Sequence, residues 1–231
     1  MIRYFFTLPD GKQETITLRL DDRTLELVGN IPATLPDWTK LDFHKCPHCP
    51  LNTISHPYCP LAANLVNIVN RFDGLLSHDE VRIDVHTEER FISQTTTVER
   101  AISSLMGLVM ATSGCPHTGF FKPMARFHLP LASKDETMYR AASMYMLAQY
   151  FLKKEGSLPD LDFEGLNKIY ENMQIINVSI LERLRSTTAT DSSSNAVMVL
   201  DIYAKTVQVA IKESLENVRH LFNTYLENDN P

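Results

Sequence analysis

Alternating apolar and polar residues predict antiparallel strands in the first thirty residues of the chain. In the segment 15–20 (TITLRL), every second residue is apolar, which gives a strand one apolar and one polar face. The segment 3–8 precedes it across Pro9-Asp10-Gly11, a tripeptide typical of a hairpin turn. With a further strand over 24–28, the pattern predicts a three-stranded meander.

A second hairpin and one helix are predicted in the next part of the chain. The segments 81–86 and 90–95 alternate in the same way and form the hairpin, while apolar residues in 61–72 recur at helical spacing. Before this helix, the segment 29–41 has the composition of an extended connector. The segment 42–60 is rich in cysteine, histidine and proline and shows no periodicity, so it needs something other than a core to hold it.

From residue 96 onward the apolar residues recur every three or four positions, which predicts helices. Two capping boxes, Thr96 with Glu99 and Ser133 with Glu136, predict where the first two helices begin. Gly114 is a suitable end for the first of them. Methionines are concentrated in these central helices, which indicates a Met-rich core or an adaptable binding surface.

Two more helices are predicted in the last third of the chain. One begins near Asp162, and the polar stretch 186–195 follows it as a loop. Beyond that loop, apolar residues recur at helical spacing from Leu200 to Tyr225. Unbroken, that last helix has roughly 30 residues and a length of about 45 Å. We therefore expect it either to kink or to project toward a protein partner, with a homodimer as one form of that contact.

These patterns predict an α+β fold within a single domain, 1–231. The strand-rich part, 1–95, contains one or two small antiparallel sheets together with the loop 42–60. The helical part, 96–231, forms a bundle. A domain of this size has ample length for a core, since domains commonly span about 100–200 residues.

Composition and charge narrow the classes of function. Hydrophobic residues make up 44% and charged residues 22%, as in ordinary globular chains. With 22 Lys and Arg against 28 Asp and Glu, the net charge is −6, so we do not expect nucleic acid as a partner. No apolar stretch has the roughly 18 residues of a membrane span. The first residues lack the pattern of a signal peptide, so we expect a cytoplasmic protein without membrane contact.

The candidate chemistry lies in four cysteines, Cys46, Cys49, Cys59 and Cys115, each followed by proline. The two-residue gap between Cys46 and Cys49 allows both sulfurs to reach one ion. Cys59 is near enough in sequence for a loop that closes back on this pair, and Cys115 arrives from another helix. We therefore predict a four-cysteine metal site that joins the strand-rich part to the helical part.

The Cys-Pro dipeptide has a physical interpretation. Proline is favoured in the first turn of a helix, which places the preceding cysteine at the cap, where the helix dipole stabilises a thiolate. Pro60 and Pro116 lead into helix-like sequence, so we expect Cys59 and Cys115 in such positions. Pro50 argues against a plain zinc ribbon, because the residue after the second cysteine of a typical zinc knuckle has a positive φ that proline cannot adopt.

Other interpretations of the cysteines are buried free thiols, two disulfides, a redox dithiol at Cys46 and Cys49, and a nucleophilic Cys115 assisted by His117. Zinc is the favoured metal, because a tetrahedral set of four cysteines with short spacings suits it. A [4Fe–4S] cluster is the alternative. Four histidines lie within three residues of a cysteine and are candidate supporting residues or alternative ligands: His44, His48, His56 and His117.

A small basic and aromatic cluster follows Cys115 in the sequence. Lys122, Arg126 and His128 lie close together in it. They form either an anion or substrate pocket beside the metal, or a solvated helix face whose phenylalanines enter the core.

The chain resembles an uncharacterised bacterial protein family known as a domain of unknown function. The resemblance rests on the segments 42–51, 56–62, 103–133 and 138–151, in which Cys-Pro-His motifs are distinctive. It covers almost the whole chain and implies a bacterial, cytosolic protein. It implies no activity, substrate or cofactor.

The function predicted from these features is that of a non-catalytic interaction or scaffold protein with a structural zinc. The ion would replace the core that the segment 42–60 lacks, because ligation free energy becomes folding free energy. The alternative is an iron–sulfur redox protein or a zinc-dependent enzyme that uses the same cysteines.

Overall fold

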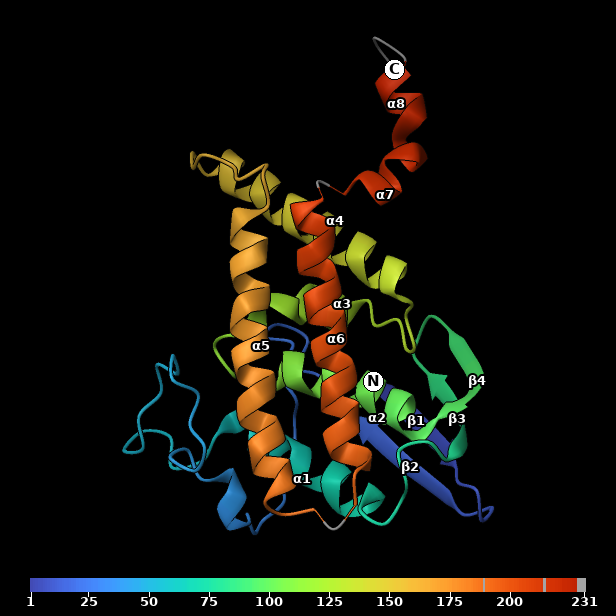
Figure 1. The fold of residues 1–231 in the computed structure, drawn as a ribbon. Helices are drawn as coiled ribbons and strands as arrows, with labels where there is room; N and C mark the ends of the chain where they lie inside the picture. The colour runs from blue at the N-terminus through green and yellow to red at the C-terminus, as the bar shows by residue number, and fades with distance from the viewer. Residues whose placement is uncertain (189, 214, 228–231) are drawn as a thin grey trace.

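A four-stranded antiparallel sheet forms the N-terminal half of the computed structural model, which describes residues 1–188, 190–213 and 215–227 (Figure 1). The strands are β1 (Ile2–Thr7), β2 (Gln13–Leu18), β3 (Glu80–His86) and β4 (Phe91–Thr97). Their order in the sheet is β2-β1-β3-β4, and each neighbouring pair is antiparallel. The predicted α+β fold with a small N-terminal sheet and C-terminal helices is confirmed.

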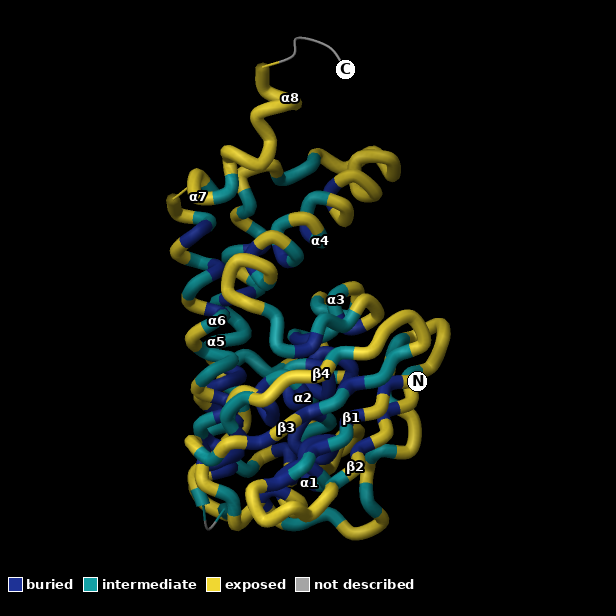
Figure 2. Tube along the Cα trace, turned by 90° about the vertical axis from the view of Figure 1, so that its right-hand side faces the viewer, coloured by how far each residue is buried: buried dark blue, intermediate teal, exposed yellow. Residues whose placement is uncertain are grey.

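One face of the sheet is covered by α1 (Pro60–Phe72) and α2 (Val98–Thr112). Alternate side chains of the strands, among them Tyr4, Phe6 and Ile83, are fully buried in this interface, as the alternation in the sequence requires. The rings of Phe6 and Phe72 lie 4.7 Å apart between their centroids. Buried residues are concentrated in this part of the molecule (Figure 2).

Three long helices build the rest: α4 (Lys134–Lys154), α5 (Glu164–Arg185) and α6 (Ser192–Lys212). α5 and α6 run side by side, and α6 also packs on α2 (Figure 1). A second, smaller apolar cluster lies where α4 meets α5 and α6. None of the helices that the structure describes is both long and apolar enough to cross a membrane.

Short elements complete the chain. They are η1 (Asp37–Thr39), η2 (Gly119–Phe121), α3 (Lys122–Arg126), α7 (Glu216–Arg219), η3 (His220–Phe222) and α8 (Asn223–Glu227).

The predicted third strand, 24–28, is wrong. The Asp21 carboxylate accepts hydrogen bonds from the backbone N–H groups of Arg23 and Thr24 and closes a tight loop, in which Leu25 has a φ of 56°. The backbone N–H of Leu27 then donates to the Thr112 carbonyl at the end of α2, at 2.9 Å. The segment is therefore bound to a helix end, and only an isolated bridge between Leu20 and Leu27 is left of strand pairing.

Of the two predicted capping boxes, one forms and one does not. Ser133 accepts from the backbone N–H of Glu136, whose carboxylate accepts from the backbone N–H of Ser133. Thr96 instead pairs with Val81 inside β4, because the strand continues into α2 without a loop. The first N–H groups of α2 donate to backbone carbonyls of residues 77 and 79, which replace the side-chain cap.

The last predicted helix, from Leu200 to Tyr225, is interrupted, in agreement with the expectation that it kinks. α6 ends at Lys212, and Leu215 has a φ of 54° before the short α7 begins. The predicted loop 186–195 is shorter than expected, because buried Ser192 donates to the Phe72 carbonyl and α6 already begins there. Residues 189 and 214 of these two segments lie outside the described residues.

The two helix starts give a prediction about stability. Ser133→Ala removes the cap of α4 and should lower the free energy of unfolding by about 1 kcal/mol, measured by urea titration. The matched control is Thr97→Val at the start of α2, where the hydroxyl is buried without a hydrogen-bond partner among the described residues. That variant should be neutral or stabilising. Equal losses in both variants would contradict the assignment of the caps.

Candidate functional site

The cysteine-bearing loop 42–60 projects from the body of the protein beside α5 (Figure 1). Backbone hydrogen bonds join its two ends: the N–H of Leu41 donates to the Pro57 carbonyl at 3.0 Å, and that of Cys59 to the Thr39 carbonyl at 2.8 Å. Cys59 is the N-cap residue of α1, and Pro60 is the first residue of that helix. The position predicted for Cys59 is confirmed.

The structure brings the four cysteines from three segments into one neighbourhood. Cys46, Cys59 and Cys115 pack against the edge of the main apolar core. Cys115 lies close enough to Cys46 and Cys59 for their charges to interact, and the same holds for Cys46 with Cys49. All four are partly buried free thiols. Among the residues that the structure describes, however, no group of three or more His, Cys, Asp or Glu side chains is arranged to hold a metal ion.

Burial controls the protonation of two of these thiols. It raises the pKa of Cys115 to about 11, against hydrogen bonds from the backbone N–H groups of His117 and Thr118. Burial also raises the pKa of Cys46, against a hydrogen bond with Ser179. The expected stabilisation of a thiolate by a helix start is therefore outweighed. For Cys115 the reason includes its position, because it opens a single turn rather than a long helix.

Arg183 of α5 is buried beside the cysteines, with 1% of its surface exposed. Its Nη1 donates to the carbonyls of Trp38 and Lys40 at 2.6 and 2.8 Å, and its Nη2 to that of Leu41 at 3.3 Å. The side chain thus holds the start of the loop. Four acidic groups act on its charge: the thiols of Cys46, Cys49 and Cys59, and the carboxyl of the exposed Asp42. The sequence interpretation missed this residue, although its place on the apolar stripe of α5 was a signal.

Two of the four candidate histidines lie together. The rings of His48 and His117 are 4.1 Å apart between their centroids, and Nε2 of His117 lies 3.0 Å from the His48 carbonyl oxygen. Both ring nitrogens of His48 are buried without a hydrogen-bond partner in the described part of the chain. His44 faces Glu182 at 3.2 Å, and His56 contacts a neighbouring serine. His48 adjoins Cys49 in the sequence, and the backbone N–H of His117 donates to Cys115.

The predicted basic cluster is divided by its partners. The Lys122 Nζ lies 3.0 Å from a carboxylate oxygen of Glu26, and the Arg126 guanidinium lies 3.3 Å from one of Glu89. His128 is half-buried and bonds Tyr4 instead, so the three side chains do not form one common pocket of free charges.

His128 belongs to a partly buried hydrogen-bond chain that begins at Tyr4 of the sheet. Its Nε2 bonds the hydroxyl of Tyr4, which in turn lies 3.1 Å from Oγ of Ser104. Burial lowers the pKa of His128 to about 3, and nearby Arg140 and Arg90 act in the same direction. The imidazole is therefore neutral near pH 7.

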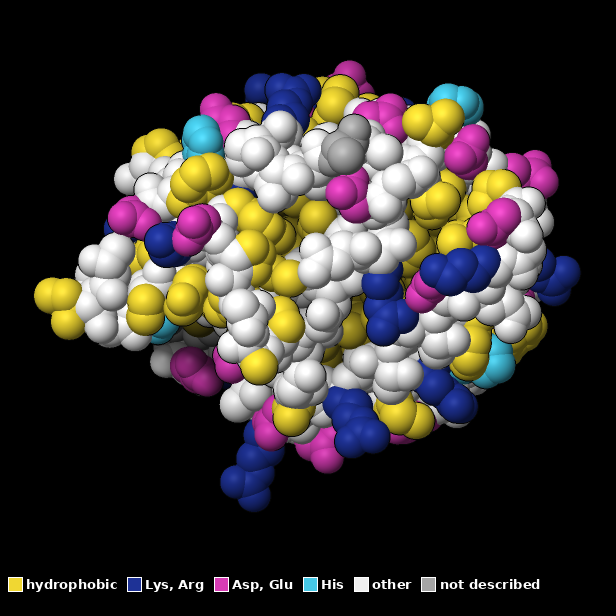
Figure 3. Space-filling model, turned by 90° about the horizontal axis from the view of Figure 1, so that it is seen from below, with side chains coloured by type: hydrophobic (Ala, Val, Ile, Leu, Met, Phe, Trp, Pro, Cys, Tyr) yellow, Lys and Arg dark blue, Asp and Glu magenta, His cyan; other side chains and the backbone are white. Residues whose placement is uncertain are grey.

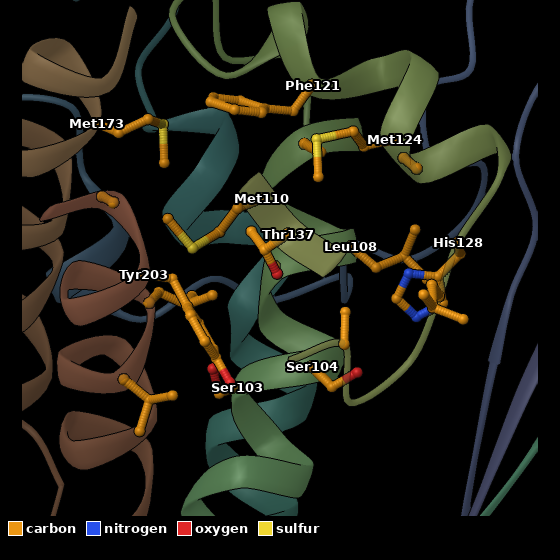
Figure 4. Close-up of a pocket in the computed structure, with 18 of the residues that line it drawn as sticks. Ser103, Ser104, Leu108, Met110, Phe121, Met124, His128, Thr137, Met173 and Tyr203 are labelled. Atoms are coloured by element: carbon orange, nitrogen blue, oxygen red, sulfur yellow. The ribbon is translucent and has the colours of Figure 1, made fainter. Parts of the chain in front are cut away.

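The sequence interpretation also missed a cavity of about 180 Å³ between α2, α3, α4, α5 and α6 (Figure 4). Methionines and Phe121 form much of its wall, and His128 lies at its edge. The concentration of methionines in the central helices was the signal in the sequence, but it could not distinguish a filled core from a cavity.

A family model described as Domain of unknown function (DUF6901) matches residues 2–223. The chain belongs to this family. The match confirms the expectation of an uncharacterised domain family that covers nearly the whole chain. For this DUF6901 chain, no match was found among curated proteins or among solved structures. The function of this member of the DUF6901 family is therefore argued from its own residues.

The neutral His128 gives a prediction about pH. Its pKa is lower in the folded state than the value of about 6.5 expected for the unfolded state, so between these values the unfolded chain binds the extra proton. The stability that this residue contributes is complete above about pH 6.5 and is lost as the pH falls toward 3. His128→Gln should remove this dependence, which amounts to about 1.4 kcal/mol per pH unit.

Urea unfolding at pH 7 and pH 5 measures the effect. The difference in stability between the native protein and the His128→Gln variant should shrink by about 2 kcal/mol on going to pH 5. Exposed His56→Gln is the control and should follow the native profile. Parallel profiles for all three proteins would show that His128 takes up a proton in the folded state.

Proposed function

We propose that the protein is a structural zinc protein in which Cys46, Cys49, Cys59 and Cys115 hold the ion. The ion would tie the loop 42–60 and the start of α1 to the turn at Cys115. Because the four thiols are not arranged for coordination as they stand, ligation requires them to turn toward a shared point. His48 and His117 are the alternative ligands, since their rings lie together and each residue is within two positions of a cysteine in the sequence.

The observation that carries this proposal is the buried guanidinium of Arg183. A buried charge is costly unless an opposite charge and hydrogen bonds compensate it. Three backbone carbonyls supply the hydrogen bonds, and no described carboxylate forms an ion pair with this residue. A zinc ion with four thiolates carries a net negative charge, and the three cysteines that act on Arg183 would place it there.

The loop also favours a metal by what it lacks. Its side chains are exposed or half-buried. Residues 42–59, all of which the structure describes, form no regular helix or strand. Such a segment gains little from apolar burial, so the free energy of ligation would stabilise its conformation. In the cytoplasmic location that we expect, the thiols stay reduced and available to the ion.

Zinc binding is tested on the native chain, purified under reducing conditions. We expect one zinc per chain and no absorption band near about 400 nm, which an iron–sulfur cluster would produce. Chelation should lower the melting temperature and change amide exchange in the loop, while most of the helical circular dichroism persists. Cys59→Ser and Cys115→Ser should each weaken zinc binding by more than about 100-fold.

The controls separate ligands from neighbours. His56→Gln should bind zinc as the native protein does, while Arg183→Met should bind it about tenfold more weakly than Arg183→Lys, which keeps the charge. A brown, iron-containing protein would replace the proposal by an iron–sulfur redox function. A chain that neither contains zinc nor gains stability when zinc is added would overturn the structural-zinc proposal. Zinc-dependent hydrolysis of a substrate by the native chain would favour the alternative of a zinc enzyme.

The work of such a scaffold is interaction, and we propose a second copy of the chain as the partner of the C-terminal segment. α8 stands away from the body of the protein (Figures 1 and 2). Its apolar side chains are uncovered: Tyr225 is 73% exposed and Leu226 53%.

On the face seen in Figure 3, Lys and Arg side chains alternate with Asp and Glu, a distribution that offers no continuous basic surface to nucleic acid there.

Light scattering with size-exclusion chromatography tests the dimer. The native chain should elute as a dimer, and a double variant with Leu221→Glu and Tyr225→Glu should shift it to monomer, because the charges cannot be buried in an apolar contact. Leu158→Glu is the matched control, since Leu158 is 95% exposed in a loop away from this segment. A native monomer at high concentration would exclude the second copy as partner.

A further inference from the structure

The cavity between the helices has the size of a small-molecule site. Its volume is about 180 Å³, and an apolar cavity of about 150 Å³ is known to accept benzene. Met110, Met124, Met173 and Phe121 lie around the space in Figure 4. Methionine side chains adapt to the shape of what they enclose. The space therefore suits one substituted benzene ring.

One wall of the cavity carries a polar group that has no use in the protein itself. Asn177 of α5 is 2% exposed and lines the cavity. Neither its Oδ1 nor its Nδ2 has a hydrogen-bond partner among the described residues. A buried amide without partners destabilises the fold, because both its donors and its acceptor have lost water. A ligand or an ordered water in the cavity would supply the missing bonds.

The charges at the cavity are of one sign. Its lining includes Arg100 and Arg140 and no Asp or Glu. Arg140 donates two hydrogen bonds, both from Nη2, to the carbonyls of Met124 and Phe127 at 2.9 Å. Within the part of the chain that the structure describes, Arg140 makes no ion pair. The carboxylate of Glu136, one turn earlier on α4, acts on the charge of Arg140 but accepts the hydrogen bond of the Ser133 backbone N–H instead of forming an ion pair. A half-buried guanidinium without an ion pair among the described residues favours an anionic ligand.

The two polar features lie at different ends of the space. Arg140 is near Tyr170, and Tyr170 is seven residues before Asn177 on α5, a separation of about 10 Å along the helix. Met173 lies between them on the same helix and also lines the cavity. An elongated ligand can therefore contact the arginine at one end and the amide at the other.

We infer that the cavity binds a small aromatic carboxylate. The carboxylate group pairs with Arg140, the ring lies among the methionines and Phe121, and a hydroxyl or carbonyl substituent at the far end bonds the amide of Asn177. This site is separate from the zinc proposal and does not depend on it, because none of the four cysteines lines the cavity.

The test uses 4-hydroxybenzoate as the probe, with the native chain, in calorimetry and ligand-observed NMR. Benzoate, which lacks the hydroxyl, should bind about tenfold more weakly, as should neutral 4-hydroxybenzyl alcohol. 4-Hydroxybenzylamine, with the opposite charge, should not bind detectably. Binding that does not distinguish the acid from the alcohol would overturn the assignment of the anion, and no binding of any of the four compounds would leave Asn177 to an ordered water and overturn the site.

Two variants locate the contacts. Arg140→Gln should weaken 4-hydroxybenzoate about tenfold or more and remove its advantage over the alcohol, whereas Arg126→Gln, whose arginine is paired with Glu89 outside this cavity, should change nothing. Asn177→Leu should remove the preference for 4-hydroxybenzoate over benzoate and keep or raise the melting temperature, which shows that the variant is folded. Unchanged affinities in both Arg140→Gln and Asn177→Leu would place the ligand elsewhere and overturn the proposal.

Discussion

The burial of α5 is the constraint on which both candidate sites depend. This helix lies between the main core and the smaller apolar cluster, yet it carries polar side chains into the interior. Arg183 binds three backbone carbonyls at the start of the loop 42–60, and Ser179 reaches Cys46. On the N-terminal side of Ser179, Asn177 and Tyr170 line the cavity. A buried polar or charged group needs hydrogen bonds or an opposite charge. Each of these residues therefore requires such partners among the groups around it.

The cysteines show two physical effects in competition. A helix start favours a thiolate, but neither Cys46 nor Cys115 caps a regular helix, and burial raises the pKa of both. In the zinc site that we propose, the ion would reverse this balance, because a bound metal deprotonates its thiols and the thiolates would match the charge of Arg183. Metal binding of this kind releases protons, so its affinity rises with pH.

Local patterns in the sequence predicted those elements well whose stabilising contacts are made by residues close together in the chain. The hairpin of β3 and β4, the helix α1 and the capping box at Ser133 depend on neighbouring residues only. The segment 24–28 failed because its partner is the distant Thr112 carbonyl. The same limit applies to the sites: the Cys-Pro dipeptides mark candidate ligands, but the buried charge of Arg183 and the unpartnered amide of Asn177 result from tertiary packing, which a periodic pattern does not describe.

The cavity follows from how the two apolar clusters meet. Phe121 packs against both clusters, and the flexible Met173 and Met124 complete the junction from opposite sides. A well-packed core fills such a junction with branched side chains, which fix a single arrangement. Here unbranched methionines lie beside an amide without hydrogen-bond partners and an arginine without an ion pair, as far as the described residues show. An apolar void gains nothing from such groups, whereas a ligand with a ring and a negative charge compensates both, so the polar groups are better explained by binding than by packing.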